Sequence, residues 1–127
     1  LKSKYIIGAH SNGNISLILN MSKFSNLYWD VILGAEVVGY YKPDPNSYKK
    51  ACAFIDLKTT ECLMVAAHND DLNAAKKEGM KTAFVLRSTE YGENQTKDLK
   101  PSQDWDFIVQ NLNELADELS CIKKGYF

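Results

Sequence analysis

The sequence predicts an α/β protein built on a parallel sheet with helices on both faces. Short apolar segments alternate along the chain with segments of helical periodicity. Parallel neighbours need crossover connections, and helices in those crossovers cover the faces of the sheet. Polar side chains directly follow two of the apolar runs, ending at Ala9 and Ala67. In open sheets of this kind, ligands bind at the carboxyl ends of the strands.

Length and charge limit the classes of function. A chain of 127 residues is enough for one domain with one core. Its net charge of -1 argues against a general nucleic-acid binder, because nonspecific affinity comes mostly from phosphate neutralisation. No apolar run approaches the roughly 20 residues of a membrane span, and no signal peptide is visible. We therefore expect a cytoplasmic protein with no nucleic-acid or membrane partner.

The three cysteines, Cys52, Cys62 and Cys121, lack the spacing of a metal site. Their odd number and apolar neighbours indicate reduced, buried thiols in an intracellular protein. We expect no metal and no cofactor.

In the first half of the chain, two strands alternate with two helices. Two prolines close together, Pro43 and Pro45, forbid a helix across them but suit a loop that leads into one. The expected elements are a buried strand over 5–9, a helix over 14–24 with Ile15, Ile18, Leu19 and Met21 at helical spacing, a strand over 29–33, an irregular segment over 34–41, and a helix over 48–55 with Ala51 and Ile55 on one face.

The second half is organised around residues 64–79, where an apolar run ends at His68 and a helical pattern closes at Gly79. Glycine is the residue type that ends helices in the left-handed conformation. The expected elements are a strand over 62–67, a helix over 71–78 that packs Leu72, Ala74 and Ala75, a strand over 82–86, a polar loop over 87–104, a strand over 106–109, and a helix over 112–122 with Leu112, Leu115, Ala116 and Leu119 inward.

Ser11 and Asn12 follow the first strand. A hydroxyl, an amide and freed backbone N–H groups at such a point can bind a carboxylate or a phosphate. The alternative is a strand-to-helix turn with a cap and no ligand. The pattern alone leaves both open.

Lys42 is a candidate cation beside Pro43. It could neutralise an anion or hold a nucleophilic carboxylate in its charged form. Most lysines are simply solvated. Tyr48 lies near the start of the next helix and could offer its hydroxyl to the same pocket, although core packing with a solvated tip is more common.

Asp70 and Asp71 are adjacent acids at a helix start. Neighbouring helix residues point about 100 degrees apart, so one of the two faces a site more easily than the other. We assign Asp71 to the site and Asp70 to solvent, with helix capping as the alternative for Asp71. His68 ends a buried strand, where packing is commoner than base catalysis.

Together these segments resemble the haloacid dehalogenase family, specifically the 2-haloacid dehalogenases. The resemblance covers nearly the whole chain, and the order and spacing of its motifs are more specific than any one of them. The matching pieces are Ser11-Asn12-Gly13-Asn14, Trp29 to Glu36, Tyr41-Lys42-Pro43-Asp44-Pro45 with Tyr48, Val65 to Ala75, Thr82 to Val85 with Arg87, Glu90-Tyr91-Gly92, and Trp105-Asp106.

The resemblance implies a Rossmann-like three-layer core and hydrolysis of a 2-haloacid, a small-molecule substrate, through an aspartyl ester. Ser11 and Asn12 would bind the substrate carboxylate, and Lys42 would keep the attacking aspartate ionised. Asp71 would help to hold Lys42 and the hydrolytic water. Tyr48 would line the pocket, and His68 stands where relatives carry asparagine or histidine.

The chain departs from the family at its start. No Asp-x-Asp motif follows a strand there, and Asp104-Trp-Asp106 precedes a strand near the end. Residues 1–127 therefore resemble a single partial core domain without the nucleophile-bearing strand and the helical cap. Without that central strand, sheet edges would lie open, so we expect a chain that is poorly stable alone or pairs with another copy.

Two other functions remain open. One is a Mg²⁺-dependent phosphatase of the same superfamily, which would carry an extra acid where this chain has Ala66 and Ala67. The other is a catalytically inactive fragment or interaction module.

Overall fold

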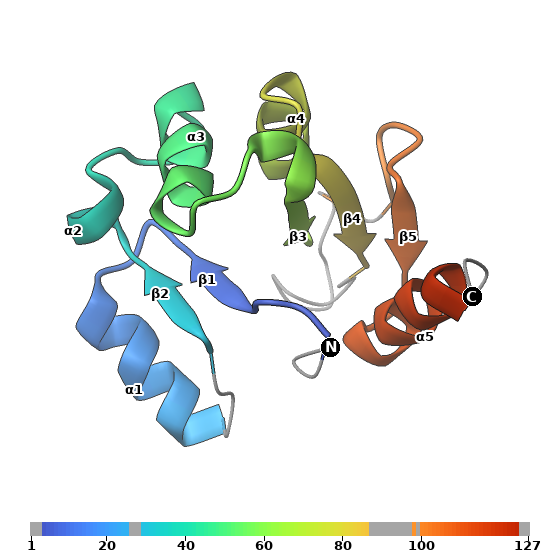
Figure 1. Cartoon of the computed structure of the whole chain (residues 1–127), viewed down its shortest axis with the longest axis horizontal. Coiled ribbons are helices and arrows are strands. Elements are labelled where there is room, and N and C mark those ends of the chain that lie inside the picture. The colour runs from blue at the N-terminus through green and yellow to red at the C-terminus, as the bar shows by residue number, and fades with distance from the viewer. Residues whose placement is uncertain (1–3, 26–28, 87–97, 99, 125–127) are drawn as a thin grey trace. The chain divides into compact units, whose positions relative to one another are not determined.

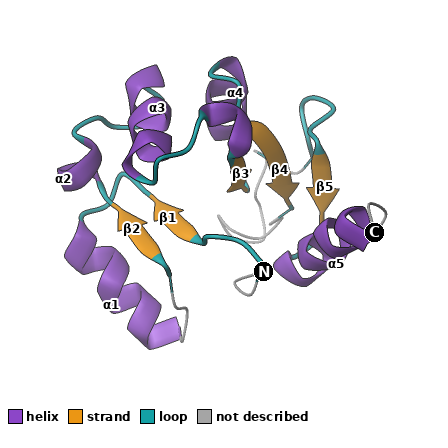
Figure 2. Ribbon diagram, in the orientation of Figure 1, coloured by secondary structure: helices purple, strands orange, loops and turns teal. Residues whose placement is uncertain are grey.

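A computed structural model of the chain describes residues 4–25, 29–86, 98 and 100–124. The chain divides into two compact units, residues 1–58 and residues 59–127. Figure 1 labels the helices and strands of both units, and Figure 2 shows helices and strands alternating along the chain.

The first unit holds a two-stranded parallel sheet, in which Gly8 pairs with Val31 and His10 with Leu33. Its elements are β1 (Gly8–His10), α1 (Ile15–Ser25), β2 (Val31–Leu33), α2 (Ala35–Val38) and α3 (Pro45–Phe54).

Helices pack on both faces of β2. Leu33 forms a buried cluster with Val38 of α2 and Ala51 of α3, and Val31 packs against it. Side chains alternate along a strand, so Ile32 points to the opposite face, and α1 also contacts β2. Ile18 and Ser22 are the buried residues of α1 among those whose side chains are described.

The second unit holds a three-stranded parallel sheet in the order β3-β4-β5. Its elements are η1 (Thr59–Glu61), β3 (Leu63–Ala66), α4 (Asn69–Lys77), β4 (Lys81–Val85), β5 (Phe107–Val109) and α5 (Leu112–Lys124).

The central strand β4 is covered on both faces. Ala83 and Val85 cluster with Leu115 of α5. Side chains alternate along a strand, so Thr82 and Phe84 point to the other face. Val85 is 9% exposed, and the other residues named here are at most 1% exposed: Thr82, Ala83, Phe84 and Leu115. Helix α4 packs against β3 and β4, and α5 against β5. Figure 1 shows α4 and α5 on different sides of this sheet.

The predicted fold class is therefore confirmed: parallel strands alternate with helices, and sheet lies between helical layers. The expectation of one partial domain over residues 1–127 stays a prediction. Arg87, Glu90, Tyr91 and Gly92 lie outside the described residues, as does the side chain of Cys121. Cys52 is buried and Cys62 half-buried, and both are free thiols.

Several expected boundaries were wrong. Residues 35–38, expected to be irregular, form the short helix α2, which ends at Gly39 with φ 79°. Helix α3 begins at Pro45, three residues earlier than expected, because proline suits the first helical position. Helix α4 begins at Asn69 and not at Asp71, whereas Gly79 has the expected left-handed backbone, with φ 90°.

Periodicity also misassigned some inward positions. Leu19 and Met21 of α1 are 43% and 61% exposed, and Ser22 is buried in their place. The Ser22 hydroxyl donates to the Ile18 carbonyl at 2.8 Å, so a serine satisfies its own polar group within the helix. In α5, Leu112 is 52% exposed, while Leu115 is fully buried as expected.

Candidate active site

The loop after β1 is closed by its own side chains. The Ser11 hydroxyl accepts a hydrogen bond from the Gly13 N–H at 3.0 Å. Asn14 accepts from the Leu17 N–H at 2.9 Å and so caps α1. The loop therefore forms a turn and a helix cap, and its role in ligand binding stays a prediction. Since Ser11 accepts in this bond, its hydroxyl hydrogen can still be donated to an anion.

Asn12 joins this loop to the loop that carries Lys42. Its Oδ1 accepts from the Lys42 N–H at 2.7 Å, and its Nδ2 donates to the Lys42 carbonyl at 3.2 Å. One amide group therefore holds both backbone polar groups of a residue 30 positions away. The structure brings together two of the residues that the sequence singled out, and it does so through the backbone of Lys42.

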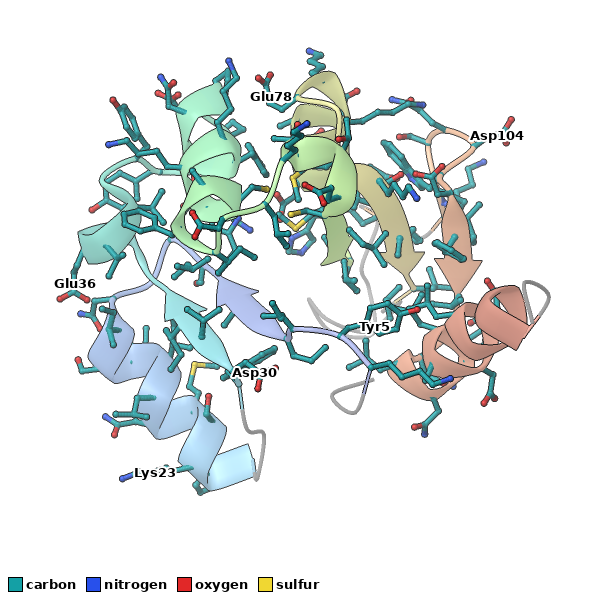
Figure 3. All side chains as sticks on the ribbon, viewed as in Figure 1. Tyr5, Lys23, Asp30, Glu36, Glu78 and Asp104 are labelled. Carbon is teal, nitrogen blue, oxygen red and sulfur yellow. The ribbon has the colours of Figure 1, made fainter. Side chains whose placement is uncertain are left out.

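A close approach between β1 and β2 supports the same loop. Gly34 is buried, and a Cβ atom there would lie 3.0 Å from the Gly13 carbonyl oxygen and 3.1 Å from the Ile15 nitrogen. Glu36 of α2 accepts a hydrogen bond from the Ile15 N–H, and Figure 3 shows Glu36 beside the start of α1. A side chain at position 34 would therefore crowd the backbone of the neighbouring loop, and glycine avoids this because it has no Cβ atom.

The loop before α3 leads directly into a capped helix. Its Lys42–Pro43 peptide bond is cis. Asp44 accepts from the Asn46 N–H at 2.8 Å, which caps α3. Lys42 is thereby held between the amide of Asn12 and a capped helix start.

Tyr48 is fully buried on α3, at 0% exposure. The ring of His10, the last residue of β1, packs edge-on against it with centroids 5.5 Å apart. His10 Nε2 also lies 2.9 Å from the hydroxyl oxygen of the buried Ser47. Sequence reasoning missed His10, although its position directly before Ser11 at a strand end was a usable signal.

In the second unit, His68 and Asp71 lie on either side of the start of α4. His68 is the N-cap residue and makes no side-chain cap hydrogen bond. Asp70 and Asp71 both lie in the first turn, where the helix dipole favours negative charge. Asp70 is exposed and Asp71 half-buried, which agrees with assigning Asp71 to the less solvated side.

The predicted site residues thus fall into two groups. Ser11, Asn12, Lys42 and Tyr48 belong to the first unit, and His68 and Asp71 to the second. Ser11 and Asn12 follow β1, Tyr48 lies in the first turns of α3, and His68 and Asp71 lie at the start of α4, while Lys42 lies in the loop before α3. Their assigned roles in binding and catalysis stay predictions.

Comparison with known proteins identifies the family. Residues 5–85 match the model of the haloacid dehalogenase-like hydrolases. The chain therefore belongs to the haloacid dehalogenase-like hydrolase family. Within that family, its likeness is to the 2-haloacid dehalogenases.

Three relatives illustrate the likeness. A solved L-2-haloacid dehalogenase, PA0810, shares 45% sequence identity with a TM-score of 0.92, over 94% of this chain and 52% of that one. The (S)-2-haloacid dehalogenase 4A of Burkholderia cepacia is 30% identical over 119 residues, covering 88% of this chain and 52% of that protein. The pyrophosphatase PpaX of Bacillus anthracis (strain CDC 684 / NRRL 3495) is 28% identical over 120 residues, covering 94% of this chain and 53% of that protein.

The chain thus spans about half the length of the curated relatives that it matches. Among the described residues, no helix is both long and apolar enough to cross a membrane.

Proposed function

We propose that this chain is the part of a 2-haloacid dehalogenase that binds the substrate carboxylate and supports an attacking aspartate. In the proposed reaction, an aspartate that this chain does not supply attacks the halogen-bearing carbon. The carbon–halogen bond breaks, and halide leaves with the electron pair. Water then adds to the ester carbonyl, which regenerates the aspartate and releases a proton and the 2-hydroxy acid.

The observation that carries this proposal is the double hydrogen bond between Asn12 and the backbone of Lys42. It fixes a cationic residue relative to the carboxyl end of β1, where Ser11 lies. A lysine held in place costs no reorganisation when negative charge must be stabilised, which is the main advantage of a preorganised site. This arrangement suits an anionic organic acid and a carboxylate nucleophile.

Each remaining site residue has a role that fits its position. The Ser11 hydroxyl donates to the substrate carboxylate, and the Lys42 ammonium keeps the nucleophile ionised. Asp71, in the first turn of α4, is the acid that we assign to the hydrolytic water. Tyr48, buried against His10, forms the wall of the pocket. His68, at the end of β3, contacts the substrate.

A second candidate function is Mg²⁺-dependent phosphate release, which the similarity to the pyrophosphatase PpaX favours. Mg²⁺ prefers octahedral oxygen ligands. This chain has Ala66 and Ala67 where an extra metal-binding acid would stand four or five residues before Asp71. The donor set of this chain is therefore poorer in oxygen ligands than that function needs, and we favour dehalogenation.

The test uses the full-length protein, meaning this chain with all the sequence that accompanies it in the gene product. We expect halide release from a 2-haloacid without added Mg²⁺. Pyrophosphate hydrolysis that requires Mg²⁺, with no halide release, would instead establish the phosphatase function.

Lys42→Ala tests the assigned cation. It should lower halide release by about 100-fold or more and prevent ester formation, because it removes a positioned charge and little packing. The exposed Lys77, in the last turn of α4, provides the matched control Lys77→Ala, which should turn over normally. Near-normal turnover of Lys42→Ala would remove Lys42 from the site.

A further inference from the structure

Asn69 is the first residue of α4, directly after His68 and two residues before Asp71. It joins α4 to the segment that precedes β5. Its N–H and its Nδ2 both donate to Asp98 Oδ1 at 3.0 Å, and Nδ2 also donates to the Lys100 carbonyl at 3.0 Å. Its Oδ1 accepts from the Ser102 N–H at 2.8 Å and from Trp105 Nε1 at 3.1 Å.

These bonds use the whole hydrogen-bonding capacity of the Asn69 side chain. A primary amide has two hydrogens to donate and two lone pairs with which to accept, and here all four are engaged. Glutamine carries the same amide group on a longer side chain, and no side chain as short as asparagine offers both two donors and two acceptors. Asn69 therefore has nothing left for a substrate, and its effect must act through the elements that it joins.

The same segment contacts α4 again, one and two turns further on. Gln103 Nε2 donates to Asn73 Oδ1 at 3.0 Å, and the Lys76 ammonium donates to Gln103 Oε1 at 3.3 Å. The Lys76 ammonium also lies 5.7 Å from the ring centroid of Trp105. Positions 69, 73 and 76 share one helix face, so residues 102–105 lie along α4 as a continuous strip.

Asp98 supplies the cap that His68 lacks. Its Oδ1 accepts the Asn69 N–H, one of the N–H groups that a helix start leaves unpaired, and its charge suits the positive end of the helix dipole. Its other oxygen, Oδ2, is buried and has no hydrogen-bond partner among the described residues. Among the described residues, the N–H and the Nδ2 of Asn69 hold this carboxylate.

We propose that Asn69 is a positioning residue that sets the rotation of the first turn of α4. Residues two apart on a helix point about 200 degrees from each other, so Asp71 faces almost opposite to Asn69. When Asn69 fixes one side of the turn against Asp98 and residues 100–105, it fixes the direction of Asp71 on the other side and the backbone of His68. The inference rests on the proposed function, since it assumes that Asp71 acts in the site.

The experiment compares Asn69→Ala with Trp105→Phe in the full-length protein. Asn69→Ala loses every side-chain bond. Trp105→Phe loses one bond but keeps an aromatic ring near Lys76, and it controls for general loosening of the segment. The first readout is hydrogen exchange of the amides of residues 69–72. It should accelerate about tenfold in Asn69→Ala and change little in Trp105→Phe.

The second readout is the NMR resonance of the Asp71 carboxyl carbon, which reports its surroundings without any turnover. It should move in Asn69→Ala and stay in place in Trp105→Phe. The third is kinetics with a 2-haloacid. In Asn69→Ala, kcat should fall about tenfold while KM stays within about twofold, because Asp71 acts after the substrate has bound.

These readouts separate the two proposals. A parent protein that releases no halide overturns the proposed function, while the Asp71 resonance still decides the role of Asn69. An unmoved Asp71 resonance in Asn69→Ala, or parental kcat despite faster exchange, would reduce Asn69 to a purely structural residue and overturn the inference.

Discussion

Asn12 shows how one side chain can organise a candidate site by holding the backbone of another site residue. Its amide holds the N–H and the carbonyl of Lys42, whereas the hydroxyl of Ser11 beside it accepts a hydrogen bond within its own turn. The resemblance predicted that residues 11, 12 and 42 share one site. It did not predict this pairing, because hydrogen bonds between distant loops leave no periodic signal.

Asn12→Ala should loosen Lys42 without unfolding the protein. Two hydrogen bonds to the Lys42 backbone are lost, so hydrogen exchange of the Lys42 amide should accelerate about tenfold. Asn12→Asp is the matched control, since a carboxylate can still accept from the Lys42 N–H. If the Lys42 amide exchanges equally fast in Asn12→Ala and Asn12→Asp, the hydrogen bond from the Lys42 N–H to the side chain of residue 12 does not hold the loop.

The backbone atoms around Gly34 leave too little room for a side chain. Ala at this position would place a methyl group 3.0 Å from the Gly13 carbonyl oxygen, and backbone atoms cannot swing away. Gly34→Ala should therefore lower the free energy of unfolding by about 1–3 kcal/mol in thermal denaturation.

Gly39 has open space around it and a left-handed φ of 79°, which asparagine tolerates. Gly39→Asn should stay within about 0.5 kcal/mol of the parent, and a cost equal to that of Gly34→Ala would refute the steric explanation.

Among the elements, α1 departs most from its sequence pattern. Leu17, Met21 and Phe24 repeat at helical spacing, yet they are 52%, 61% and 93% exposed. Figure 3 shows Lys23, the one charged residue of α1, near the end of that helix. Periodicity identifies a helix with an apolar side, but it cannot say which of two apolar sides faces the sheet.

Charge on that exposed face should therefore be tolerated. Met21→Glu and Phe24→Glu should each change the free energy of unfolding of the full-length protein by less than about 0.5 kcal/mol. The buried Ile18 provides the control within the same helix, because Ile18→Ala should cost about 2–5 kcal/mol. Losses in the glutamate variants as large as that of Ile18→Ala would mean that another part of the full-length protein covers this face.

The start of α4 was harder to predict than its end. Gly79 follows α4 in the left-handed conformation that glycine favours, as expected. The start of α4 was misplaced because its cap comes from Asp98, which is 29 residues from Asn69 in the sequence. A local motif can show a capping side chain next to its helix, but it cannot show one that arrives from another loop.

For the whole chain, the alternation of strands and helices predicted the fold class because parallel neighbours need crossovers, and the helices between β1 and β2 and between β3 and β4 leave local patterns. The strand partners are not local. The structure pairs β1 with β2 in one sheet, and in a second sheet it pairs β4 with both β3 and β5. The number of sheets therefore could not be read from periodicity, whereas the order of elements could.

Those two sheets lead to a prediction about this chain by itself. Among the described residues, β1 has β2 as its one strand partner, and β3 has β4. Each strand thus presents an edge that can pair with another strand, and a two-stranded sheet is at best marginally stable in water. We expect the isolated 127-residue chain either to elute from a sizing column above the mass of a 14.3 kDa monomer or to melt broadly, and to release no halide.

Sedimentation equilibrium and circular dichroism melting decide between these outcomes, with the full-length protein as the reference. If strand pairing drives association, the mass should rise with concentration, because free edges on two copies must meet. Lysine substitutions on an exposed edge should then reduce association, since charged side chains discourage edge pairing. A monodisperse monomer that melts cooperatively would show instead that both edges are satisfied within one copy, and the expectation of open edges would fall.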